Sequence, residues 1–252
     1  MITLMRTRVM AMSICVAAVG IAVEPVLGLP AGDELRAQVV ARYPREAIRS
    51  WKPLWFLAPT LTAAVVSWED PAFYHHGGLS YPDMFEALKE NLRQGRFARG
   101  GSTITQQVAK NLFLTRDKTL RRKLQDAVLA RRLEKVLSKD EILEVYLNIA
   151  EWGPHVYGAE AAARFYFDVS ANQLDWSQAA LLVAMLPNPH LFSPCAPGAD
   201  AEQRRNHVLE ILFLNGTITS SEHERAAASP ILVSCAQTPA RRGLTAGLTT
   251  PS

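Results

Sequence analysis

Hydrophobic and polar residues follow a helical pattern along most of the chain after Pro30. Apolar side chains recur every three or four positions, which places them on one face of a helix. The pattern predicts helices at residues 58–68, 81–94, 120–133, 139–147 and 176–186, and one more after Thr219. No segment shows the clear two-residue alternation of a half-buried strand, and no internal repeat is visible. The sequence therefore predicts a mainly α fold.

Helix-capping residues precede four of these segments. Short polar side chains accept hydrogen bonds from the free amides of a first helical turn. The four residues are Ser80, Ser138, Asp175 and Thr219. At Ser138 and Thr219 a glutamate follows three positions later, which completes the spacing of a capping box. These residues mark where the helices are expected to begin.

The N-terminal segment is apolar. Residues 9–23 carry no charge, and Arg6 and Arg8 precede them. A positive flank before an apolar run directs the rest of a chain across a membrane. Two interpretations of residues 1–29 stay open. One is a single transmembrane helix, which we favour because the apolar character continues to Leu29. The other is a cleaved signal peptide. Both place the remainder on the outer side.

The remaining chain is predicted to form one α-rich domain at residues 30–236 and a disordered tail at residues 237–252. The 252 residues are 48% hydrophobic and 20% charged, which are globular values. Three cysteines are too few for a disulfide-scaffolded mini-protein, and they show no metal-binding spacing. In an exported domain Cys195 and Cys235 would either form one disulfide or remain buried thiols.

The middle of the chain is strongly basic. Residues 89–135 contain thirteen Lys or Arg and four Asp or Glu, a balance of +9, whereas the whole chain carries +3. Such a one-sided excess indicates an anionic partner, such as phosphate groups or an acidic membrane surface. The predicted helix at residues 84–94 has one apolar face bordered by basic residues, a pattern that fits a lipid interface or a packed core.

Two further groups of residues could carry chemistry. Gly100 and Gly101 precede a helix on which Thr103, Gln107 and Lys110 share one face, an arrangement suited to an anion. Arg122, Lys123 and Asp126 lie within one helical turn and could neutralise a phosphate or hold a metal ion, unless they are an ordinary surface ion pair. Glu69 and Asp126 are candidates for the paired carboxylates of sugar chemistry.

These segments, in this order, resemble the peptidoglycan glycosyltransferases of family 51, most closely the monofunctional biosynthetic transglycosylases. The resemblance covers about residues 68–194 and rests on five motifs. The first comprises Glu69, Asp70, Phe73, His76 and Gly78, and the second runs from Gly101 through Ser102, Thr103, Gln106, Gln107 and Lys110 to Asn111. The third contains Arg122, Lys123, Asp126 and Glu134; the fourth contains Tyr146 and Asn148; the fifth runs from Ala180 to Pro189.

The resemblance implies a lysozyme-like lobe and a smaller membrane-facing lobe. It implies polymerisation of lipid II into β-1,4 glycan strands at the bacterial inner membrane, with the catalytic domain on the periplasmic side. Glu69 and Asp126 would be catalytic. Asp70, Phe73, His76, Ser102, Thr103, Gln106, Gln107, Lys110, Asn111, Arg122 and Lys123 would bind substrate. Glu134, Tyr146 and Asn148 would support the site.

The resemblance also implies which cofactors and partners the reaction needs. Asp126 would assist a divalent metal, Mg²⁺ or Mn²⁺, and no organic cofactor is expected. The partners would be lipid II, the nascent glycan strand, the membrane and other cell-wall synthesis proteins, and no nucleic acid. Asp126 departs from the family, which has Glu at this position, so the second carboxylate is one methylene shorter. Two other functions compete: a lysozyme-like or lytic enzyme that cleaves the glycan, and a catalytically silent scaffold.

Overall fold

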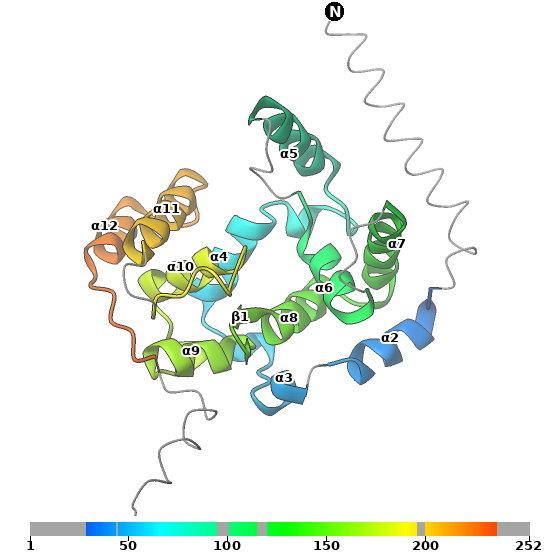
Figure 1. Ribbon diagram of the computed structural model, residues 1–252, viewed down its shortest axis with the longest axis horizontal. Helices are drawn as coiled ribbons and strands as arrows, with labels where there is room; N and C mark the ends of the chain where they lie inside the picture. The colour runs from blue at the N-terminus through cyan, green and yellow to red at the C-terminus, as the bar shows by residue number, and fades with distance from the viewer. Residues whose placement is uncertain (1–28, 44, 95–100, 115–119, 196–199, 236–252) are drawn as a thin grey trace, which may run out of the picture. The chain divides into compact units, whose positions relative to one another are not determined.

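The computed structural model describes residues 29–43, 45–94, 101–114, 120–195 and 200–235, and these are mainly helical (Figure 1). The described chain divides into two compact units. The first contains the residues up to Trp55 and Val65–Ala150, and the second contains Phe56–Ala64 and the residues from Glu151 onward. The predicted anchor or signal at residues 1–29 lies outside the described residues except for Leu29, and the predicted tail at residues 237–252 lies wholly outside them.

The first unit is built on α6 (Ile104–Phe113), which packs against α7 (Leu120–Val136) and α8 (Lys139–Ile149). Its other elements are α2 (Gly32–Ala41), α3 (Arg45–Arg49), η3 (Phe73–His75), α5 (Tyr81–Gln94), most of η2 (Leu54–Phe56) and the end of α4 (Pro59–Glu69). The core between the three packed helices is aliphatic, with Ile104, Leu129, Leu133, Ile142 and Leu143 fully or almost fully buried. Burial of these side chains holds α6 in place.

The predicted helix starts are confirmed where the structure describes them. Ser138, Asp175 and Thr219 each accept a hydrogen bond from the amide three residues later, and each forms a capping box. Thr103 does the same at the start of α6, directly after the glycines. These caps satisfy amides that have no partner inside the helix, so the local sequence alone sets the start of each helix.

The second unit contains a two-stranded antiparallel hairpin, β1 (Glu151–Gly153) and β2 (Val156–Tyr157). The hairpin has no signal in the sequence, because strands of three and two residues are too short to show a two-residue period. Gly153 in β1 lies against the Tyr166 ring, whose hydroxyl donates to the carbonyl oxygen of Trp152 at 3.0 Å. A Cβ at Gly153 would lie 2.0 Å from that hydroxyl oxygen, so this contact requires glycine.

Four helices follow the hairpin. They are α9 (Ala159–Phe167), α10 (Trp176–Met185), α11 (Ala201–Leu214) and α12 (Ser220–Ala228), with the short η4 (Ala171–Gln173) between the first two. The sequence shows no clear apolar period for α11, because its core face includes the almost fully buried Arg205. The Arg205 guanidinium donates to the Ser177 hydroxyl and to the carbonyl oxygens of Ala227 and Ser229, and thereby satisfies the C-terminal end of α12.

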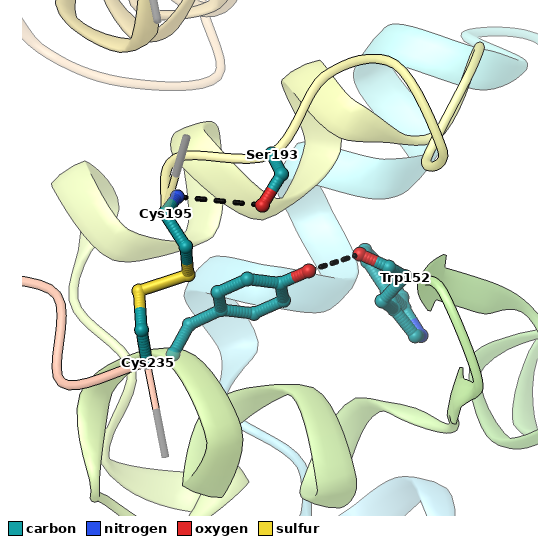
Figure 2. The surroundings of a disulfide bond; sticks show 5 residues. Trp152, Ser193, Cys195 and Cys235 are labelled. Atoms are coloured by element: carbon teal, nitrogen blue, oxygen red, sulfur yellow. Dashed lines mark hydrogen bonds between the residues drawn. A yellow bond between two sulfur atoms is a disulfide. The ribbon is translucent and has the colours of Figure 1, made fainter. Parts of the chain in front are cut away.

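A disulfide joins Cys195 to Cys235, which decides between the two alternatives left open by the sequence (Figure 2). It connects the segment after α10 to the end of the described chain. The amide of Ser234, beside Cys235, donates to the carbonyl oxygen of Tyr166 in α9 at 2.7 Å. The bond and this contact together hold the segment after α12 against α9.

None of the described helices is long and apolar enough to cross a membrane. The amphipathic helix α5 extends away from α6, α7 and α8 in Figure 1. Its buried Ala87 packs near Gly101, whereas Leu92 in its last turn is 74% exposed. The helix is thus packed around Ala87 and exposes Leu92 in its last turn.

Replacing Cys235 with serine should lower the free energy of unfolding by about 2–4 kcal/mol, because the disulfide closes a loop with a sequence separation of 40. Chemical denaturation with and without a reductant measures the loss. Cys195→Ser and the double variant should lose the same amount as the single variant, since each removes the same bond. A wild-type protein with equal stability in both conditions would contradict the prediction.

Candidate active site

Glu69 is the last residue of α4, and its carboxylate is held by a side chain of α6. The Gln107 amide donates to Glu69 Oε2 at 2.6 Å, and the buried Tyr146 hydroxyl of α8 donates to Gln107 Oε1 at 3.4 Å. Burial raises the pKa of Glu69, the neighbouring Asp70 adds to the rise, and Gln107 and Lys110 oppose it. A carboxylate with a raised pKa is a stronger base than an exposed one once it is ionised.

Asp70 lies beside Glu69 in sequence but has a different environment. Its side chain is almost fully buried, and its two oxygens accept from His76 Nε2 at 2.9 and 3.0 Å. Asp70 Oδ2 also accepts from the amide of Ile104, the first residue of α6, at 3.0 Å. Because His76 Nδ1 accepts from the Gly78 amide at 3.1 Å, the histidine carries its proton on Nε2. Both oxygens of Asp70 are therefore used in hydrogen bonds, one of which holds the start of α6.

Gly78 brings three of the motifs together. Its φ of +90° lies in the region that favours glycine, and a Cβ there would lie 2.8 Å from the carbonyl oxygen of Ala130 in α7. Its own carbonyl oxygen accepts from the Thr103 hydroxyl at 2.7 Å, directly before α6. The backbone of Gly78 therefore contacts both the Thr103 side chain at the start of α6 and the backbone of α7.

Asp126 in α7 is a buried carboxylate among cations. Its Oδ1 has no hydrogen-bond partner among the described residues. Burial raises the pKa of Asp126 to about 6, although Lys110, Arg122 and Lys123 each favour the charged form. Lys110 acts electrostatically on both Glu69 and Asp126, so the exposed Lys110 ammonium links the two carboxylates of the candidate site.

The residues around Asp126 do not fit a metal held by protein side chains alone. A divalent cation of the Mg²⁺ type needs several oxygen ligands, and no group of three or more His, Cys, Asp or Glu in the described chain is arranged to hold one. Three positive side chains around a single carboxylate fit an anion better than a cation.

Six other predicted residues are either exposed to solvent or buried in supporting contacts. Ser102, Lys110, Asn111 and Lys123 are exposed, where they could meet a substrate. Gln106 is buried and completes the capping box of Thr103, so it shapes the loop. Asn148 is also buried, and its side chain bonds both the amide and the carbonyl of Lys52 at 2.8 Å, which fixes the segment before α4.

Glu134 lies in a separate polar junction with Thr105 and Lys139, which are not among the predicted site residues. Its Oε1 accepts from the Thr105 hydroxyl at 2.6 Å and from the Lys139 ammonium at 2.7 Å. Lys139 could have been noticed in the sequence, because a positive charge directly after a helix cap opposes the helix dipole. Glu144 was also missed; it accepts from the Trp51 indole and the Leu54 amide.

The family model described as Transglycosylase matches residues 36–213. A biosynthetic peptidoglycan transglycosylase of Nitrosospira multiformis is 48% identical over 149 residues, which is 59% of this chain and 65% of that protein. One of Chromobacterium violaceum is 45% identical over 161 residues, 63% of this chain and 71% of that protein. Penicillin-binding protein 1A of Aquifex aeolicus is 44% identical over 170 residues, 68% of this chain and 23% of that protein.

Asp126→Asn should make the fold more stable at pH 8 by as much as about 3 kcal/mol, and at pH 4 by less than about 1 kcal/mol. The folded carboxyl keeps its proton up to about pH 6, whereas the unfolded one loses it near 3.8. The folded state therefore binds more protons in this window, and wild-type stability falls as the pH rises through it. Urea denaturation at both pH values measures the difference. Asp33→Asn, at an exposed carboxylate of α2, is the control; an equal gain there would contradict the prediction.

Proposed function

The chain belongs to the transglycosylase family, and from this premise we propose that it polymerises lipid II into β-1,4 glycan strands and releases undecaprenyl pyrophosphate. The family resemblance of the motifs is confirmed by these matches. The observation that carries the proposal is the presence of the half-buried Glu69 carboxylate, whose pKa is raised, near Lys110, which belongs to the cluster of cations around Asp126. A base and an anion-binding cluster are what this transfer requires.

Glu69 is proposed as the general base. The 4-hydroxyl of the acceptor sugar gives its proton to the Glu69 carboxylate as its oxygen attacks the anomeric carbon of the growing chain. The bond from that carbon to the pyrophosphate breaks, its electron pair leaves with the pyrophosphate, and the anomeric centre is inverted. The Gln107 amide fixes the orientation of the carboxylate through its 2.6 Å hydrogen bond.

The cations are proposed to stabilise the departing pyrophosphate. Pyrophosphate is a good leaving group, so it needs neutralisation more than a general acid. Lys110, Arg122 and Lys123 can supply it, and Lys110 lies within electrostatic reach of both carboxylates. The Asp126 carboxylate, when ionised, would partly offset the positive charge of these three side chains. Because no metal site is formed by the side chains that the structure describes, we infer that a divalent ion would depend mainly on the substrate phosphates.

We further propose that the protein works at the bacterial inner membrane, with the first unit bearing the membrane-facing surface and with the anchor or signal in residues 1–29. The apolar surface of α5, with Leu92 74% exposed and basic residues beside it, supports this placement. The disulfide supports an oxidising compartment outside the cytoplasm. The lysozyme-like lobe and the cell-wall partners remain part of the same proposal.

Glu69→Gln should reduce polymerisation of labelled lipid II by about 10²–10⁴-fold, because it removes the base and keeps the side-chain size. Binding of lipid II should persist. Electrophoresis of the glycan products measures the rate, and Glu34→Gln on the surface of α2 serves as the control. Turnover at the wild-type rate would exclude Glu69 as the base. Release of soluble fragments from finished peptidoglycan would favour the lytic alternative, and neither activity would favour the scaffold.

A chain that begins at Pro30 should still bind vesicles that contain anionic phospholipid, and Leu92→Asp should weaken that binding several-fold. The substitution places a charge on the apolar surface of α5. Co-sedimentation with vesicles at low and high salt measures the affinity. Leu214→Asp, at a similarly exposed leucine of α11 that is 67% exposed, is the matched control. Equal binding by both variants would remove α5 from the membrane contact.

A further inference from the structure

Lys139, the first residue of α8, lies between two motif segments without belonging to the site described above. Its ammonium nitrogen is 2.7 Å from Glu134 Oε1 and 4.4 Å from the centroid of the Phe73 ring. The side chains of Lys139 and Glu134 are only 19% and 10% exposed. An ion pair and a cation–π contact with little solvent around them are stronger than their surface equivalents.

The same oxygen of Glu134 joins three helices. It accepts from the Thr105 hydroxyl of α6 at 2.6 Å and from Lys139 of α8, while Glu134 itself belongs to α7. Thr105 stands two residues before Gln107, which holds the Glu69 carboxylate. A shift of this junction would therefore move the start of α6 and, with it, the amide that orients the base.

A second connection runs through η3. Phe73, under the Lys139 ammonium, donates its amide to the carbonyl oxygen of Asp70 at 2.9 Å. The Tyr74 hydroxyl donates to the Asp140 carboxylate at 3.1 Å, so consecutive residues of η3 contact consecutive residues of α8. Because Asp70 directly follows Glu69, the position of η3 also determines where the base lies.

A lysine at the first position of α8 is unfavourable in itself, which indicates that the contacts of Lys139 offset this cost. A positive charge in the first turn of a helix is disfavoured by the helix dipole. Removing one member of a buried ion pair leaves the other uncompensated. In Lys139→Met, Glu134 would have to turn toward water, which would break its bond with Thr105.

We infer that Lys139 is a positioning residue for Glu69. Lys139 holds η3 and the start of α6 at the junction of α7 and α8. The inference rests on the proposed function, because it assigns the effect to the base of that reaction. Glu69 is faced by Gln107 and Lys110 of α6, by Asp70 and by Tyr146 of α8. Lys139 acts on Glu69 by two routes: through the start of α6, which carries Gln107, and through η3, which contacts Asp70.

The test compares Lys139→Met and Lys139→Arg with Lys135→Met, a matched change at an exposed lysine of α7. Polymerisation of labelled lipid II gives kcat and KM for the full chain from pH 4 to pH 9. Lys139→Met should lower kcat about 10–100-fold with KM changed less than about threefold, because small displacements of a catalytic group cost this much. Lys139→Arg should recover most of kcat, since a guanidinium also pairs with a carboxylate and stacks on a ring.

The pH dependence separates positioning from a merely structural role. Burial raises the pKa of Glu69, so water admitted by a loosened junction should lower it, and the acid limb of kcat should move to lower pH in Lys139→Met. Titration of Glu69 by carbon NMR of ¹³C-labelled glutamate, assigned with Glu69→Gln, should show the same shift without any substrate.

Each outcome is decisive. A wild-type kcat and acid limb in Lys139→Met would overturn the inference, whatever its melting temperature, and so would an equal effect of Lys135→Met or no recovery in Lys139→Arg. If the wild-type chain did not polymerise lipid II, the proposed function would fail. The NMR titration would still decide the positioning role, because an unchanged Glu69 titration in Lys139→Met overturns it independently.

Discussion

The backbone contact of Gly78 with α7 is the constraint on which the candidate site depends. At φ +90°, with the Ala130 carbonyl where a Cβ would lie, this residue has room only for glycine. Its amide holds His76 and its carbonyl holds Thr103, so His76 is directed to Asp70 and Thr103 to the cap of α6. Two segments that are far apart in sequence are thereby brought within hydrogen-bond distance, and Glu69 meets Gln107 as a consequence.

The same packing sets the electrostatics. Burial raises the pKa of both Glu69 and Asp126, and the cations around them compensate only in part. The candidate site thus holds two carboxylates in environments that disfavour their charge, which costs stability and is typical of functional sites. The neighbouring carboxylates differ from these two: both oxygens of Asp70 and the Oε1 atom of Glu134 accept hydrogen bonds from the protein.

The second unit is stabilised by other means. Arg205 satisfies the carbonyls at the end of α12 from inside the core, and the Cys195–Cys235 bond covalently closes the segment that contains α11 and α12. A covalent closure of this kind persists only in an oxidising compartment, which agrees with the apolar and positively flanked N-terminus. The disulfide of the second unit and the N-terminal sequence thus support the proposed location outside the cytoplasm.

The sequence by itself determined the helices, their caps and the family. Capping boxes and apolar periods depend on residues within one or two turns, so they could be recognised at Ser138, Asp175 and Thr219 without a structure. The motifs likewise identified Glu69, Asp126 and the cations around them. Short strands and the Arg205 face of α11 carry no such local signal. Only the tertiary structure decided that Asp70 is enclosed, that Cys195 pairs with Cys235 and that Lys139 joins three segments. Those properties arise from contacts between residues tens of positions apart, and the spacing of residues along a chain does not encode which distant side chain will occupy a buried oxygen or lie over a ring.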